Sequence, residues 1–479
     1  MKVMLMWPAG TPETKVLFDV LTSAGHEIMY WVGEHSAEHL APKGTVFHEH
    51  YDALIGKPAD AFASTQFTPP SMRLIEQHCG LESAVLSMMN KHFDGAPVDE
   101  RKQIYYNMLA YWSYVMERIQ PEAVIFTTIP HSIYDFIVYS LAKERGLSTI
   151  MFEDTWVAGR LIWFTDYKTG SDAFASALAH NANSSVSAEK LTDDLRAYYE
   201  SQTGVSQVKP LYMALLQEQD KTWNLLRHRL RVAIQSIQNG TFFPLMLSFV
   251  HSRFQKNLRD EYRAVTQSPN LEKPFVYFPL GFQPERTTSP QGGVFCDQIL
   301  VAQTLAAALP KGWALYIKEH PSQWWLRSKT RYNCVRYEGY YRRLAAIPGA
   351  RLVPIDMDSH QLIAACKTVA TVTGTAGWEA LFRLKKPLIF GYPWYVPTPL
   401  LHRVASVDDC IAAFRETQRE PNFRREELLR LLKSFEESTV HAYVAPLRDQ
   451  TGRVFYDDAV TPEENMRIVA KRVCEELKR

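Results

Sequence analysis

The chain has 479 residues, enough for two or three domains of ordinary size, and its 46% hydrophobic content is that of a globular protein. Its 53 Lys and Arg residues nearly balance its 52 Asp and Glu residues, so the net charge of +1 gives no global field that would gather nucleic acid. The six cysteines form no Cys-x-x-Cys pair, which argues against a zinc ribbon or a disulfide framework and favours a reducing cytoplasm. No apolar run reaches about 18 residues, so we expect a soluble, cytoplasmic protein.

Hydrophobic runs and turn residues in the N-terminal half predict strands and helices in alternation. The expected elements lie within the segments 2–8, 11–25, 27–34, 99–120, 123–130, 132–145 and 148–154. Residues 35–97 are punctuated by Pro58, Pro69 and Pro70 and show no clear period, so we expect a loop-rich region there. The βα units predict one parallel sheet.

The C-terminal half repeats this pattern. Residues 273–393 alternate strand and helix, as a second parallel sheet covered on both faces requires. The expected organisation is α/β, with two Rossmann-like parallel-sheet domains facing a cleft. Its parts are an N-terminal domain over 1–204, a helical connecting segment over 205–268, a C-terminal domain over 269–455 and a C-terminal helix over 456–479.

A polar cluster follows directly after one predicted strand of the C-terminal half. The apolar alternation of WALYI leads into Lys318, Glu319, His320 and Pro321. Open α/β sheets bind ligands at the carboxyl ends of their strands, so this cluster is a candidate ligand site. The structural alternative is that His320 is a buried, hydrogen-bonded histidine before a turn proline.

A second candidate site lies between the strand TVATVTG and the helix AGWEALFRLKK. Thr373, Gly374 and Thr375 precede the helix, where free backbone N–H groups and the positive end of the helix dipole suit an anion such as a nucleotide phosphate. Lys318 and His320 would add positive charge from the neighbouring strand end. The alternative is that Thr375 is only an N-cap.

These motifs carry a family resemblance. The segments YFPLGFQPERTTSPQGG, LPKGWALYIKEHPSQ and TVTGTAGWEALFRLKKPLIFG resemble the bacterial capsule polysaccharide biosynthesis proteins, which include the capsule Kdo transferases, over roughly residues 273–395. The resemblance implies a GT-B glycosyltransferase that binds the donor nucleotide through His320 with Pro321, through Thr373 to Thr375, and through Glu379 at the ribose. Lys318 is expected beside them.

The resemblance also implies a substrate class. The donor would be a CMP-linked acidic sugar such as Kdo or a related nonulosonic sugar, and the acceptor a bacterial surface polysaccharide or a glycolipid such as lipopolysaccharide. No cofactor and no catalytic metal are expected. Two alternatives remain open, a nucleotide-sugar epimerase of GT-B-like fold and a non-catalytic glycan-binding or assembly protein.

The catalytic group is expected at the strand ends of the N-terminal domain. We favour Asp154 and Glu153 at the end of the strand IMFED, with His131 next, and we also consider Asp135 and Asp166. A carboxylate there would deprotonate the acceptor hydroxyl or attack the anomeric carbon. The structural alternatives are that Asp154 only turns the chain and that Asp135 only caps the next helix.

Glu285 and Arg286 follow the first strand of the C-terminal domain and are expected to bind polar groups of donor or acceptor, which the resemblance favours over a plain surface turn. Two metal-like patterns are discounted. Asp356 and Asp358 are better explained by helix capping, and the His-Glu-His run at residues 48–50 lacks the helical i, i+4 histidine pair of a zinc protease.

One segment bears on localisation. Residues 227–238 and 242–256 mix basic with apolar side chains, so they would either contact the inner membrane peripherally, where a lipid-linked acceptor lies, or pack between the domains. Packing between the domains is the preferred interpretation.

Overall fold

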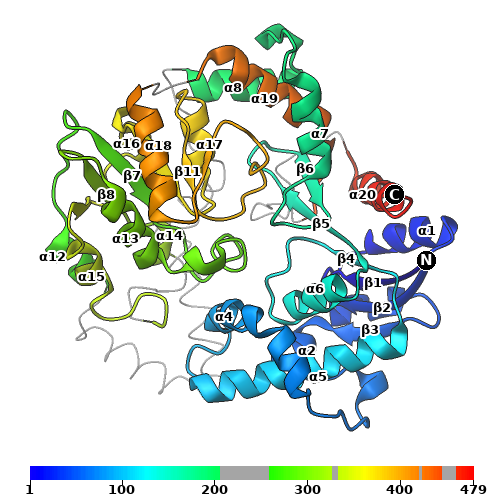
Figure 1. Cartoon of the computed structure of the whole chain (residues 1–479). Helices are drawn as coiled ribbons and strands as arrows, with labels where there is room; N and C mark the ends of the chain where they lie inside the picture. The colour runs from blue at the N-terminus through cyan, green and yellow to red at the C-terminus, as the bar shows by residue number, and fades with distance from the viewer. Residues whose placement is uncertain (205–257, 326–332, 420–422, 445–459) are drawn as a thin grey trace, which may run out of the picture.

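The computed structural model describes residues 1–204, 258–325, 333–419, 423–444 and 460–479. Figure 1 shows two bodies, each centred on a sheet, the first built mainly from the N-terminal half and the second from the C-terminal half. Both sheets are mainly parallel, as the alternation of strand and helix predicted. The predicted α/β class is therefore confirmed.

The first sheet has the order β13-β6-β5-β4-β1-β2-β3. Its strands are β1 (Lys2–Met6), β2 (Glu27–Gly33), β3 (Val46–Glu49), β4 (Ala123–Phe126), β5 (Ser148–Asp154), β6 (Arg160–Phe164) and β13 (Val440–His441). β6 runs antiparallel to β5, and β13 antiparallel to β6. Buried hydrophobic clusters lie on both faces of this sheet, which explains why the central strands are nearly continuous apolar runs.

The first domain contains more regular structure between residues 35 and 97 than the sequence predicted. Its helices are α1 (Thr14–Ser23), α2 (His50–Ile55), α3 (Met72–Gln77), α4 (Cys79–Met88), α5 (Val98–Ile119), α6 (Tyr134–Glu144), α7 (Asp172–Asn181) and α8 (Asp193–Thr203). The loop-rich prediction was wrong for these elements, and β3, α2 and α3, with 4, 6 and 6 residues, are too short to show a period. Pairing with β2 and packing against α5 stabilise them instead.

The second sheet is parallel throughout and has the order β12-β11-β10-β7-β8-β9. Its strands are β7 (Phe275–Pro279), β8 (Ala314–Lys318), β9 (Ala350–Leu352), β10 (Thr368–Thr371), β11 (Leu388–Ile389) and β12 (His402–Arg403). The helices of this domain are α12 (Leu258–Val265), α13 (Gln298–Ala308), α14 (Ser322–Trp325), α15 (Tyr340–Ala345), α16 (Ser359–Ala365), α17 (Thr375–Leu381) and α18 (Val407–Arg419).

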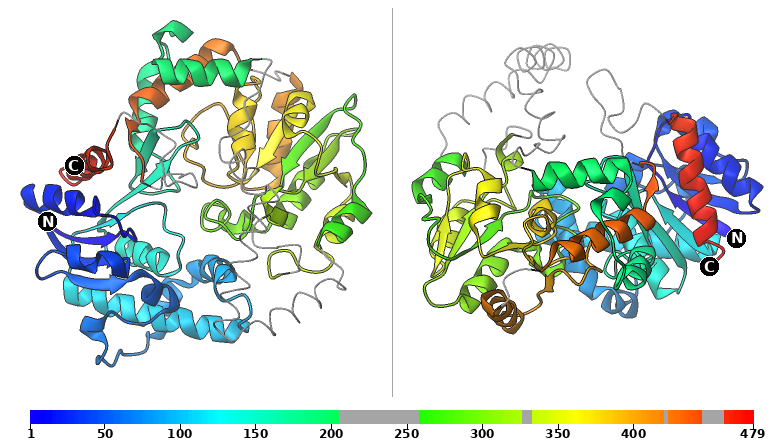
Figure 2. Two further views of the ribbon diagram at one scale, coloured as in Figure 1. Left: turned by 180° about the vertical axis from the view of Figure 1, so that it is seen from behind. Right: turned by 90° about the horizontal axis from the view of Figure 1, so that it is seen from above.

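The end of the chain returns to the first domain. Helix α19 (Arg425–Glu437) packs on α7, β13 joins the first sheet, and α20 (Pro462–Glu476) packs on α1, as Figures 1 and 2 show. The buried Arg160 side chain of β6 donates a hydrogen bond to the Glu436 carbonyl at 3.4 Å, which fixes the end of α19 to the first sheet. The change of domain therefore falls between residues 419 and 423 rather than at 455, because an amphipathic helix suits either sheet and only long-range contacts choose between them.

The predicted helical connecting segment over 205–268 lies largely outside the described residues, as do both segments considered for membrane contact. Its last part is α12, which packs on α15 in the second domain. Among the described helices, none is long and apolar enough to cross a membrane.

Candidate functional site

A cleft of about 620 Å³ opens where the carboxyl ends of strands from both sheets meet. Residues after β5 form one wall with the end of α8, and residues after β7, β8 and β10 form the other. The lining residues are Asp154 to Trp156, Ala158, Tyr198, Gln202, Pro279 to Phe282, Glu285 to Thr288, His320, Thr371 to Ala376, Trp378 and Glu379. Open α/β sheets bind ligands at this edge. Two Rossmann-like domains facing one cleft make the fold GT-B-like.

His320 lies in this wall, directly after β8. Its Nδ1 accepts the backbone N–H of Ser322 at 3.2 Å, so the neutral ring carries its proton on Nε2. Burial lowers the pKa of His320 to about 4, against the opposing effect of Glu319. At neutral pH the side chain is therefore an uncharged hydrogen-bond donor, suited to a phosphate or sugar oxygen.

The residues between β10 and α17 form the adjacent part of the same wall. The Thr373 hydroxyl donates to the Thr287 carbonyl, and the Gly374 N–H donates to the Thr371 hydroxyl at 3.0 Å, so the loop is held in place by its own polar groups. The first N–H groups of α17, at Thr375 and Ala376, have no partner within the helix by geometry. They remain the backbone donors that this loop can offer a ligand.

Glu379 faces the cleft from α17. Burial raises its pKa, while His360, whose Nδ1 lies 3.8 Å from Glu379 Oε2, and the Thr375 hydroxyl favour the charged form. The carboxyl group is only 13% exposed. A carboxyl group in such a place can hold a pair of sugar hydroxyls, which is the chemistry of a ribose.

Arg286 connects the two domains across the cleft. Its Nη2 lies 3.0 Å from Glu153 Oε1, and its Nη1 donates to the Thr128 hydroxyl. Gln291 Nε2 donates to the other oxygen of Glu153 at 3.5 Å. Burial raises the pKa of Glu153, and the Arg286 guanidinium opposes that shift. Glu153 therefore lies behind the cleft as the buried partner of Arg286, which itself remains 21% exposed.

The opposite wall carries Asp154 and Trp156. Asp154 ends β5, lines the cleft and accepts the backbone N–H of Val444 at 3.1 Å through Oδ1. The half-buried Trp156 ring lies 5.6 Å from the Trp394 ring and 5.5 Å from the Tyr395 ring, centroid to centroid. A carboxylate next to an aromatic face suits a sugar, whose hydroxyls bond the carboxylate while its C–H groups contact the ring. Our sequence analysis did not select Trp156.

Several predicted site residues do not line the cleft. The Lys318 ammonium donates to the Met357 carbonyl and, at 2.9 Å, to the Ser359 hydroxyl, and burial lowers its pKa to about 8. Pro321 follows His320 and is not among the residues that line the cleft. His131 donates from Nδ1 to the Ile129 carbonyl at 2.9 Å, and burial and the Arg286 charge lower its pKa to about 4.

Four other residues considered in the sequence make contacts within the protein. Asp358 caps α16 by accepting the His360 N–H at 2.9 Å, and Asp135 accepts the Ser132 N–H at 2.7 Å at the start of α6. His48 bonds to the Tyr30 hydroxyl and the Lys57 carbonyl, which accounts for both of its ring nitrogens. Asp166 binds Lys143 at 3.4 Å.

Comparison with known proteins places this site in a matched region. Residues 285–425 match the family model described as "Capsule polysaccharide biosynthesis protein", which covers Glu285, Arg286, His320, the Thr373 loop and Glu379. The resemblance inferred from the sequence motifs is thereby confirmed for this segment. No curated protein matches the chain.

The solved structures that match include KpsC of Thermosulfurimonas dismutans, a beta Kdo 2,7 transferase, at 11% identity and TM-score 0.27 over 63% of this chain and 78% of that one. They include UDP-GlcNAc 2-epimerase of Methanocaldococcus jannaschii at 10% identity and TM-score 0.24, over 89% and 95%. They also include the spinosyn rhamnosyltransferase SpnG at 13% identity and TM-score 0.24, over 91% and 95%. Because these TM-scores are low, the fold assignment depends on the strand order and the cleft above.

Proposed function

We propose that the protein is a glycosyltransferase that moves a sugar from a nucleotide donor to a bacterial surface polysaccharide or glycolipid. The observation that carries this proposal is the cleft between the carboxyl ends of strands from the two sheets. One wall presents hydrogen-bond donors and a buried carboxyl group suited to a nucleotide, and the other presents a carboxylate and an aromatic ring suited to a sugar. The match of residues 285–425 to capsule polysaccharide biosynthesis proteins supports the same reaction class.

The resemblance of the sequence motifs to the capsule Kdo transferases favours a CMP-linked acidic sugar as the donor. Among the described lining residues Arg286 is the cation, and His320 is neutral because its pKa is lowered to about 4. A CMP-sugar carries one charge on its phosphate and a UDP-sugar carries two on its diphosphate, so one lining cation suits the phosphate of a CMP-sugar better. Arg286 would then pair with the phosphate or the sugar carboxylate, as in Kdo and related nonulosonic sugars. The reaction would need no metal and no cofactor.

Asp154 is the proposed catalytic carboxylate. It is the lining carboxylate on the wall opposite His320, so it can accept the proton of an acceptor hydroxyl or attack the anomeric carbon, while the CMP leaves with its phosphate held by His320, Arg286 and the start of α17. Glu153 would contribute indirectly, by holding Arg286 in place.

Calorimetric titration with CMP, UDP, GDP and CDP tests the proposal, using the wild type, His320→Ala and, as a control, His180→Ala at an exposed position on α7. We expect selective CMP binding that is weakened about 10- to 100-fold in His320→Ala, as the loss of one hydrogen bond to a charged phosphate implies, and unchanged in His180→Ala. Selective UDP or GDP binding would refute the acidic-sugar donor. An epimerised sugar released from the donor alone would indicate an epimerase, and glycan binding without nucleotide binding would indicate an assembly protein.

A further inference from the structure

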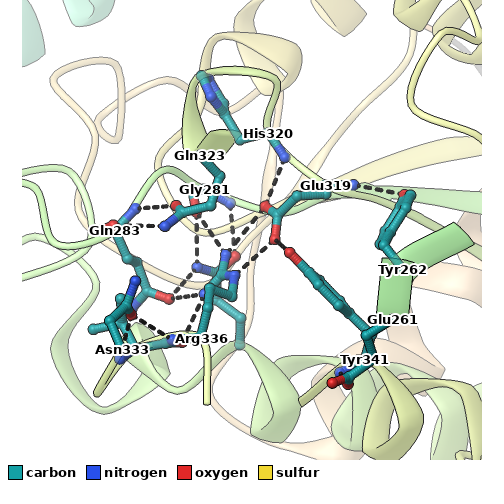
Figure 3. A network of polar contacts seen from close by, with 12 residues as sticks. Glu261, Tyr262, Gly281, Gln283, Glu319, His320, Gln323, Asn333, Arg336 and Tyr341 are labelled. Atoms are coloured by element: carbon teal, nitrogen blue, oxygen red, sulfur yellow. Dashed lines mark hydrogen bonds and ion pairs between the residues drawn. The ribbon is translucent and has the colours of Figure 1, made fainter. Parts of the chain in front are cut away.

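Behind the wall that carries His320 lies a buried ion pair, drawn in Figure 3. Arg336 Nε lies 2.7 Å from Glu319 Oε2, and both side chains are 0% exposed. The same carboxylate accepts the Tyr341 hydroxyl at 2.6 Å and the backbone N–H of His320 at 2.7 Å. The Glu319 carboxylate of the Glu-His-Pro motif is thus hydrogen-bonded within the protein, and one of these bonds fixes the backbone of His320.

The ion pair also reaches the loop that follows β7. Arg336 Nη1 donates to Gln283 Oε1 at 2.6 Å, and Nη2 donates to the Gly281 carbonyl at 3.3 Å. Tyr262 adds a further support, because its hydroxyl accepts the Glu319 N–H at 3.0 Å. One guanidinium therefore ties the loop after β7 to the loop after β8.

Gln323 ties the same two loops a second time. Its side-chain amide accepts the backbone N–H of Gln283 at 3.1 Å and donates to the backbone carbonyl of Gln283 at 3.0 Å, as a neighbouring strand would. The Gln323 side chain is 0% exposed, and its own N–H donates to the His320 carbonyl at 2.9 Å. The turn from His320 to Gln323 is therefore fixed against the loop after β7.

From this arrangement we propose that Gln323 and Arg336 are positioning residues, which hold the His320 ring at the cleft for the nucleotide phosphate without touching the nucleotide themselves. Both lie behind the wall that the cleft presents. Gly281 and Phe282, on the tied loop, line the cleft beside His320, and the Phe282 and His320 ring centroids are 6.0 Å apart. Fixing both loops removes the cost of ordering them when the nucleotide binds. The proposal rests on the proposed nucleotide site.

The test uses Gln323→Met, which keeps the length of the side chain and removes both bonds to Gln283. Asn465→Leu is a matched control in the first domain, where it bears on the segment next to Asp154 and not on the wall that carries His320. The Asn465 amide, on α20, likewise accepts the N–H of one residue, Tyr443, at 2.8 Å and donates to its carbonyl at 3.0 Å, and it is also buried. Each substitution removes one hydrogen bond accepted from a backbone N–H and one donated to a backbone carbonyl, so the two should lower the melting temperature by similar amounts.

CMP affinity is measured by calorimetry, well below the melting temperature of each variant. We expect Gln323→Met to weaken CMP binding about ten-fold, or ~1.4 kcal/mol, and Asn465→Leu to change it less than about two-fold. In the His320→Ala background Gln323→Met should have less than about a two-fold effect, because its influence passes through the His320 ring. Arg336→Lys keeps the positive charge but cannot make all the hydrogen bonds of the guanidinium group. It should likewise weaken CMP binding when His320 is present and have little effect in the His320→Ala background.

Three results would overturn the proposal. They are equal losses of CMP affinity in Gln323→Met and Asn465→Leu, unchanged affinity in Gln323→Met, or an undiminished loss in the His320→Ala background. Absence of CMP binding in the wild type is a separate result, which would overturn the proposed donor and this inference together.

Discussion

Replacing Arg336 by Met should be among the most destabilising substitutions in the second domain. The guanidinium is 0% exposed and bonds to Glu319, Gln283 and Gly281. Methionine fills much of the same volume but leaves the Glu319 carboxylate buried without its counter-charge. Breaking a buried pair in this way costs about 3–5 kcal/mol, well above the cost of an exposed pair.

Urea unfolding at neutral pH measures the change directly, and calorimetry gives the corresponding shift in melting temperature. At about 2–4 °C per kcal/mol for a domain of this size, the expected fall is roughly 6–20 °C. The companion variant Arg336→Met with Glu319→Gln removes the unpaired charge, so it should recover at least half of the lost free energy of unfolding.

Tyr341→Phe is the control for a single lost bond. It removes the 2.6 Å hydrogen bond to Glu319 and leaves the ion pair intact, so it should cost only about 1–2 kcal/mol. The reasoning fails if Arg336→Met costs less than about 1 kcal/mol, or if adding Glu319→Gln deepens the loss, because either result would mean that the buried charge is compensated by something other than Arg336.

Three further predictions concern pH and the two walls of the cleft. Burial lowers the pKa of His48 to about 4, so the contribution of the neutral ring to stability is complete above pH 6.5 and is lost as the pH falls towards 4. Between pH 7 and pH 4 the free energy of unfolding of the wild type should therefore fall by about 3 kcal/mol relative to that of His48→Gln. Urea unfolding measures both, and a difference that stays constant with pH would contradict the prediction. Asp154→Asn should lower sugar transfer from CMP-Kdo to an oligosaccharide by about 10²–10⁴-fold with CMP affinity unchanged in calorimetry, and an active variant would exclude Asp154 as the catalytic carboxylate. Trp156→Ala should raise the KM for the oligosaccharide about ten-fold, a loss that Trp156→Phe largely restores if stacking is the cause.

Much of the candidate site follows from local sequence. Lys318 to His320 come directly after an apolar run, and Thr373 to Thr375 come between a β-branched run and a helix, so both had to lie at strand ends of a parallel sheet. His320, Thr373 to Thr375 and Glu379 do line one cleft. The placement of these residues at strand ends was predictable, because strand and helix periods are local properties of the chain.

The direction of each side chain was not predictable in the same way. Lys318 and His320 are two residues apart, yet the Lys318 ammonium bonds to the Met357 carbonyl while His320 faces the cleft. Glu153 and Asp154 are adjacent, but only Asp154 lines the cleft, because Glu153 pairs with Arg286 from the other domain. These outcomes depend on partners far along the chain.

The sequence by itself determined the alternation of strands and helices, the α/β class and the strand ends where a ligand site forms, since periodicity and turn residues act over a few positions. Only the tertiary structure decided that α19, β13 and α20 return to the first domain, that Gln323 and Arg336 tie two loops behind His320, and which carboxylate reaches the cleft. The physical reason is that burial, ion pairing and sheet register are set between residues distant in sequence, whose proximity no local pattern contains.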